Sequence, residues 1–132
     1  MEYLRKGLSK VKDTVSQVEL LSKINEATAN ESGYAGISLL NEISSRSDNP
    51  EDCKFIVKNC IKLLSLKPKM WKRILRALAL IEHIIKTGSQ DFVDRIKDER
   101  DSLRELYEFT YDDDGKDRGE GSKYKKLLNI YF

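Results

Sequence analysis

Residues 67–89 read KPKMWKRILRALALIEHIIKTGS, and the spacing of the apolar side chains predicts one long helix. Pro68 suits the opening of this helix, because proline is tolerated in a first turn, and Gly88 suits its end after Thr87. The apolar positions recur at helical spacing and are Trp71, Ile74, Leu75, Leu78 and Ile81. The sequence therefore predicts that this helix packs into the core.

The same stretch carries a strip of positive charge. Basic side chains fall at i, i+3, i+4 and i+7 and are Lys69, Lys72, Arg73 and Arg76. No acidic residue lies between Cys53 and Ile81, and the preceding helix adds a second basic row, Lys54, Lys58 and Lys62. A solvated helix face explains most charge runs, but two neighbouring unpaired rows favour an anion site. Nucleic acid is disfavoured because no aromatic interleaving or reading motif accompanies the charge, which leaves phosphorylated lipid headgroups.

The rest of the chain predicts further helices with short connections. A capping box, Ser16-x-x-Glu19, predicts a helix start at 17, and Asn49-Pro50 predicts another. The expected helices span 17–29, 37–45, 50–65, 68–87, 89–108 and 123–131, with a polar loop over 111–121 and no strand pair. The 132 residues fit one domain. The expected fold is all-α, a superhelical stack of helical hairpins.

Residues 1–15 form a separate amphipathic pattern, so we divide the chain into 1–15 and 16–132. The apolar positions include Leu4, Leu8 and Val11, and the basic residues between them are Arg5, Lys6, Lys10 and Lys12. Such a segment suits a membrane interface, although a helix packed on its own domain is the simpler alternative. A helix this short is marginal in water, so it can remain unfolded until its apolar face is received.

Composition narrows the class of protein. The chain has 24 basic and 22 acidic residues, a net charge of +2, and no apolar run near the ~20 residues of a membrane span. Cys53 and Cys60 are expected to be reduced packing residues, and His83 a satisfied core histidine. DDDGKD at 112–117 lacks the spacing of a calcium loop. We expect a cytoplasmic protein that is not an enzyme and binds no metal or cofactor.

Three segments resemble one family. KINEATANES at 23–32, WKRILRALALIEHIIKTGS at 71–89 and DDDGKDRGEGSKYKK at 112–126 are similar to patterns of the ENTH domain of epsins and epsin-related proteins. The third pattern separates this family from the related ANTH and VHS domains. The resemblance implies a helical superhelix that binds phosphoinositides and helps to build clathrin-coated membranes. It also implies an N-terminal helix that folds on the headgroup and inserts into the leaflet.

The resemblance also implies roles for individual residues. The headgroup contacts would be Arg5, Lys6, Lys10, Asn30, Lys69, Arg73 and Arg76, with Lys12, Lys62 and Lys72 as secondary basic residues. The membrane-inserting residues would be Leu4, Leu8 and Val11. Two positions depart from the pattern of epsins that bind phosphatidylinositol 4,5-bisphosphate, because Asn25 and Leu63 stand where those proteins have arginine. Weaker binding, a monophosphate lipid or general anionic-surface binding therefore stay open.

The expected function is a phosphoinositide-binding membrane adaptor module of clathrin-coated vesicle formation or of endosomal or Golgi trafficking. Its partners would be a phosphoinositide-containing membrane and SNARE or coat proteins, with no nucleic acid, and it would be a monomer in solution. It would lie peripherally on the plasma membrane, endosomes or Golgi-derived membranes. The alternative is a helical module that recognises a SNARE or other trafficking protein and binds anionic lipid only weakly.

Overall fold

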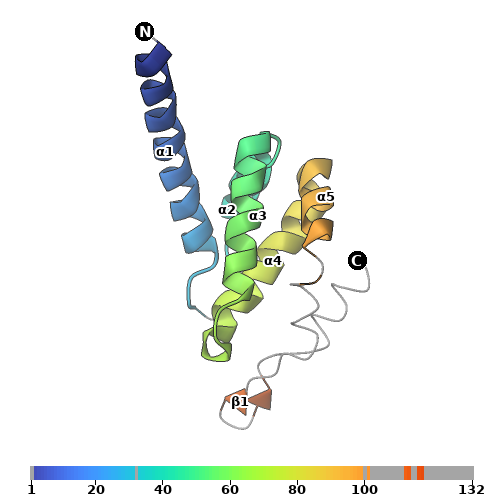
Figure 1. Cartoon of the computed structure of the whole chain (residues 1–132). Helices are drawn as coiled ribbons and strands as arrows, with labels where there is room; N and C mark the ends of the chain where they lie inside the picture. Colours follow the sequence, from blue (N-terminus) through green and yellow to red (C-terminus); the bar gives the residue numbers. More distant parts are fainter. Residues whose placement is uncertain (1, 32, 100, 102–111, 114–115, 118–132) are drawn as a thin grey trace.

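The computed structural model describes residues 2–31, 33–99, 101, 112–113 and 116–117, and side chains only between Val15 and Asp101. Within these residues the helices follow one another in a stack (Figure 1). They are α1 Glu2–Ala27, α2 Ile37–Arg46, α3 Pro50–Leu64, the 3-10 turn η1 Pro68–Met70, α4 Trp71–Thr87 and α5 Gln90–Asp98. α1 packs on α2 and α3, both of these pack on α4, and α5 covers α3 and α4. The expected all-α architecture is confirmed.

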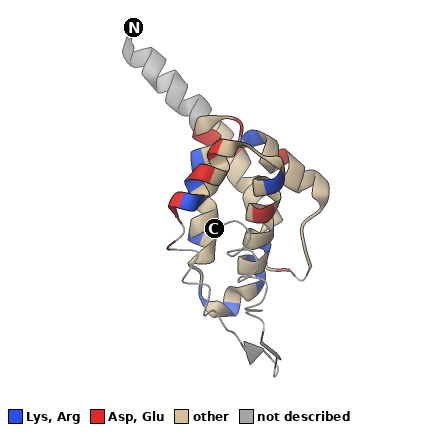
Figure 2. Cartoon of the chain, turned by 90° about the vertical axis from the view of Figure 1, so that its right-hand side faces the viewer, with Lys and Arg blue, Asp and Glu red and all other residues tan. Residues whose placement is uncertain are grey.

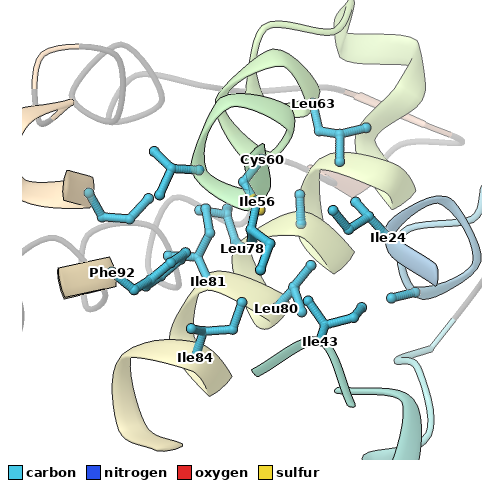
Figure 3. Close-up of a cluster of buried hydrophobic side chains, with 14 of the residues drawn as sticks. Ile24, Ile43, Ile56, Cys60, Leu63, Leu78, Leu80, Ile81, Ile84 and Phe92 are labelled. Atoms are coloured by element: carbon cyan, nitrogen blue, oxygen red, sulfur yellow. The ribbon is translucent and has the colours of Figure 1, made fainter. Parts of the chain in front are cut away.

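α4 supplies the centre of the core (Figure 3). Ile74, Leu80 and Ile81 are fully buried, and neighbouring helices meet them with further apolar side chains, among them Ile24, Ile43, Ile56 and Phe92. Complete burial of each such side chain contributes roughly 1.5–3 kcal/mol to the stability of the folded protein. Leu75, which the pattern also assigned to the core, is only half-buried. Trp71 is also only half-buried, so the predicted packing of this helix is confirmed for Ile74, Leu78 and Ile81.

The predicted helix start at residue 17 is wrong, because α1 continues from Glu2 to Ala27. The Ser16 hydroxyl does not serve as a cap. It accepts a hydrogen bond of 2.7 Å from Nη2 of Arg46, whose Nε donates to Asp52 at 2.9 Å. One arginine of α2 therefore joins α1 to α3 at the residue where a break was expected.

Two predicted helix starts are confirmed. Asn49 caps α3 by accepting the backbone N–H groups of Glu51 and Asp52, at 3.0 and 3.1 Å. Ser89 caps α5 by accepting the N–H of Phe92 at 3.2 Å. α5 ends at Asp98, however, so the single helix expected over 89–108 is interrupted.

The expected absence of a strand pair is also wrong. β1, Asp112–Asp113, pairs antiparallel with β2, Lys116–Asp117. The sequence between them is Asp-Gly, the pair typical of two-residue hairpins, so the signal was present in the polar loop. The final helix predicted over 123–131 lies outside the described residues.

Gly88 is required by a close approach of two turns. Gly88 follows the last residue of α4, as predicted, and its φ of −95° is open to any residue. A Cβ at this position would lie 2.6 Å from Oγ of Ser47 and 2.6 Å from Cγ2 of Ile84. The same Ser47 hydroxyl accepts the N–H of Ser89 at 3.0 Å, and the Ser89 hydroxyl donates to the Ser47 carbonyl at 2.8 Å. Two hydrogen bonds and the close packing at Gly88 therefore connect the α2–α3 turn to the α4–α5 turn.

We expect Gly88→Ala to lower the free energy of unfolding by about 1–3 kcal/mol, because the added methyl group must displace this buried junction. Gly36→Ala is the matched control, since φ is −63° there and nothing lies within 4 Å of its Cβ position. Urea unfolding followed by circular dichroism measures both. Equal stability of the two variants would contradict the close packing at Gly88.

Candidate anion-binding site

Two arginines of α4 hold the C-terminal end of α1. Nε of Arg76 donates to the carbonyl of Ala27 at 3.0 Å, and Nε of Arg73 donates to the carbonyl of Thr28 at 3.0 Å. The last carbonyls of a helix lack partners within the helix and carry partial negative charge, so cations stabilise them. The two arginines therefore fix where α1 ends.

The loop after α1 is held over the start of α4 by the same contacts. Nη1 of Arg76 lies 3.6 Å from Oε2 of Glu31, and the Thr28 hydroxyl donates to the Ile24 carbonyl at 2.7 Å. Asn30 lies between these residues and is exposed. The predicted headgroup residue Asn30 is consequently brought close to the arginines of α4.

The expected strip of four free cations needs correction. Of the four, only Lys69, in η1, is exposed, while the Lys72 amine lies 5.6 Å from the centre of the Trp71 ring. Arg73 is half-buried, and Arg76 is only 6% exposed. Helical spacing placed the four on related turns, but it could not show that α1 occupies part of that face.

The basic end of the molecule is where α3 passes through η1 into α4. Figure 2 shows Lys and Arg at this end, whereas basic and acidic residues are mixed at the opposite end. Lys67 and Lys69 are both exposed there. Unbalanced charge at one end orients a domain on an anionic surface.

The remaining predicted residues face other surfaces, belong to the core or lie outside the described side chains. Lys62 is exposed and lines a groove between α3 and α5. Asn25 is exposed, whereas Leu63 is 7% exposed and belongs to the core. The backbone positions of α1 include Arg5, Lys6, Lys10, Lys12, Leu4, Leu8 and Val11, whose side chains are not described. None of the described helices is long and apolar enough to cross a membrane.

Val18 is an exposed apolar residue of α1 that the sequence analysis did not include in the apolar stripe. Val15 and Val18 are 63% and 62% exposed, whereas Leu20 and Ile24 of the same helix are fully buried. At 100° per residue, Val18 lies roughly 160° around α1 from Leu20. Position 18 extends the spacing of apolar positions 4, 8, 11 and 15, so the apolar stripe continues past the expected boundary at residue 15. The stripe ends at Val18 because the next position at helical spacing, residue 22, is a serine.

The two cysteines and the histidine are packing or hydrogen-bonded residues. Cys53 and Cys60 are buried free thiols, and burial raises the pKa of Cys60 to about 12. A buried thiol of this kind is a poor nucleophile, because the thiolate is the reactive form. His83 is half-buried, not a core residue, and its Nε2 lies 2.7 Å from Oδ1 of Asn41. In the described part of the chain, no cluster of three His, Cys, Asp or Glu side chains could hold a metal.

The sequence and the fold correspond to one family. A family model described as ENTH domain matches residues 16–130, and the chain belongs to the ENTH domain family. It is similar to Epsin-1 of Rattus norvegicus, with 31% identity over 130 residues that cover 96% of this chain and 22% of that protein. It is similar to Epsin-3 of Saccharomyces cerevisiae, with 31% identity over 133 residues, 98% of this chain and 32% of that protein. The chain thus spans between about a fifth and a third of the length of these relatives.

Solved ENTH domains share the backbone arrangement. The epsin-2 ENTH domain in complex with phosphatidylinositol 4,5-bisphosphate has a TM-score of 0.80 and 25% identity, covering 85% of this chain and 81% of that one. The human epsinR ENTH domain has a TM-score of 0.74 and 27% identity, covering 86% of each. The resemblance drawn from the three sequence segments is therefore confirmed.

We expect Arg76→Met to lower the free energy of unfolding by about 1–3 kcal/mol, because the Ala27 carbonyl loses a buried donor. Lys69→Met removes an exposed cation from the same end and should change stability by less than about 0.5 kcal/mol. Urea denaturation compares the two. Similar midpoints for both variants would show that the arginine does not anchor α1.

Proposed function

We propose that this chain is a phosphoinositide-binding adaptor module that attaches peripherally to the cytoplasmic face of membranes. The observation that supports it is the convergence of Asn30, Lys69 and Arg73 at one end of the fold, where no carboxylate other than Glu31 makes a described ion pair with these groups or with Arg76. The epsin-2 ENTH domain, which shares the fold, has been solved with phosphatidylinositol 4,5-bisphosphate. Nζ of Lys69 and the remaining N–H groups of Arg73 would meet the phosphates.

The N-terminal part of α1 would complete the attachment. Arg5, Lys6 and Lys10 would contact phosphates, and Leu4, Leu8 and Val11 would enter the leaflet. Each basic residue near an anionic bilayer contributes about 1 kcal/mol, and each buried apolar side chain roughly 1.5–3 kcal/mol before the cost of ordering. We propose that residues 1–15 become fixed in helical form on the membrane. Lys12 and Lys72 would add charge near the same surface, whereas Lys62 lines the groove between α3 and α5.

The headgroup selectivity follows from the two departures from the epsin pattern. Asn25 carries no charge, and Leu63 is used for packing. We therefore infer that the site binds by charge and discriminates weakly between monophosphate and bisphosphate headgroups. The protein would act as a monomer in coated-vesicle formation or in endosomal or Golgi trafficking, with coat proteins as further partners.

A protein-binding role is the second candidate, and exposed apolar residues favour it. Tyr34 is 56% exposed and lines a hollow of about 320 Å³ together with Leu75 and Leu78, and Ile37 is 62% exposed. A SNARE or other trafficking protein could use such a surface. In that case a charge reversal at Lys69 would leave partner binding unchanged, since Lys69 does not line this hollow.

We expect Lys69→Glu to weaken binding to vesicles that contain phosphatidylinositol 4,5-bisphosphate by about tenfold or more, because two units of charge change at the surface. Lys97→Glu makes the same charge change on α5 and should alter binding by less than about twofold. Co-sedimentation at low and physiological ionic strength measures both, and binding should fall with salt. Equal loss in the two variants would argue for attraction by net charge alone.

Removal of residues 1–15 should abolish sedimentation with vesicles while leaving the domain folded. The shortened chain begins at Ser16 and retains the contact with Arg46 and the buried Leu20 and Ile24. Vesicles with phosphatidylinositol monophosphates and bisphosphate form the panel, and circular dichroism reports folding. Undiminished binding by the shortened chain would exclude insertion, and failure of the full chain at low salt would exclude the membrane role itself.

A further inference from the structure

A second cationic surface lies away from the candidate headgroup site. A groove of about 400 Å³ runs between α3 and α5, and its cations are Lys54, Lys58, Lys62 and Arg95. α3 separates this groove from α1, since α1 packs on one side of α3 and α5 on the other (Figure 1). If α1 rests on a membrane, the groove is turned away from that membrane.

Two of the four cations of the groove make no ion pair within the described part of the chain. Among the described residues Lys58 and Lys62 have no ion pair, and Lys54 reaches Glu51 only at 3.6 Å, with both side chains more than half exposed. Arg95 is different, because its Nε is held by Asp91 at 3.0 Å. The acidic residues that line the groove are Asp98 and Glu99, so four cations face two carboxylates.

The shape of the groove favours an extended ligand. Lys54, Lys58 and Lys62 are spaced at i, i+4 and i+8, so their backbone positions span about 12 Å along α3. That length equals about three to four residues of extended chain. Val57 and Ile61 also line the groove; Val57 is buried and Ile61 is half-buried, so Ile61 offers more of the apolar surface. A row of cations beside an apolar strip fits a chain that carries both carboxylates and apolar side chains.

We propose that the groove between α3 and α5 binds a short acidic, extended peptide segment of a partner protein. Its carboxylates would lie along Lys54 and Lys58, and an apolar side chain would rest on Val57 and Ile61. This site is additional to the membrane surface. The protein could therefore hold a lipid and a peptide at the same time on opposite sides of α3.

The test uses a fluorescent eight-residue peptide in which glutamate and leucine alternate, titrated with the full chain and followed by anisotropy. We expect saturable binding that weakens with salt. K54E/K58E should weaken it by about tenfold or more, because two attractions become repulsions. K97E reverses one charge outside the groove and is the matched control for K58E alone. Lys97 is an exposed lysine of α5 that does not line the groove, so K97E should change binding by less than about twofold, and K58E should weaken it more.

Two further peptides and one lipid measurement complete the test. Replacement of glutamate by glutamine, or of leucine by serine, should each weaken binding. Vesicle sedimentation of K54E/K58E should match that of the unchanged protein. The proposal is overturned if the acidic peptide does not bind at low salt, if K97E weakens it as much as K58E, or if the glutamine peptide binds equally well. It is also overturned if K54E/K58E loses vesicle binding, because the lysines would then belong to the lipid surface.

Discussion

The hydrogen bond from Arg76 to the carbonyl of Ala27 joins the core of the fold to its candidate site. Arg76 is on the central helix, next to the buried Ala77, and is itself only 6% exposed. A buried guanidinium without acceptors would be strongly unfavourable, so the end of α1 has to lie where its carbonyls can satisfy it. The position of the α1–α2 loop, and with it Asn30, depends on this one constraint.

The same constraint gives different roles to the basic residues of η1 and α4. Arg76 is a structural residue, Arg73 is shared between the Thr28 carbonyl and the surface, and Lys69 is free to meet a ligand. A net charge of +2 gives little information about such a molecule, because the charges are unevenly placed. Nearby surface charges act within a Debye length of about 8–10 Å, so the local arrangement matters more than the sum.

Asn25 and Leu63, the two residues that depart from the epsin pattern, have different surroundings in the structure. Asn25 is exposed, so charge is absent from a position that could reach a ligand. Leu63 is buried among the core residues at the end of α3 and contributes packing. The site is therefore built mainly from the start of α4 and the loop after α1. The second basic row on α3 faces α5, which explains how one charge-rich stretch of sequence supplies two separate surfaces.

The sequence by itself determined the helices whose signals are local. Apolar spacing indicated α4 and its buried face, and the Asn49 and Ser89 caps marked the starts of α3 and α5, because a cap bonds only to its own first turn. Tertiary contacts decided the rest. Ser16 is not a cap because α1 is already helical before it, and its hydroxyl bonds Arg46 of another helix. The basic strip at the start of α4 is divided because α1 ends against it. Gly88 is needed for the approach of a turn 41 residues earlier in the chain, at Ser47, and no local pattern contains that information.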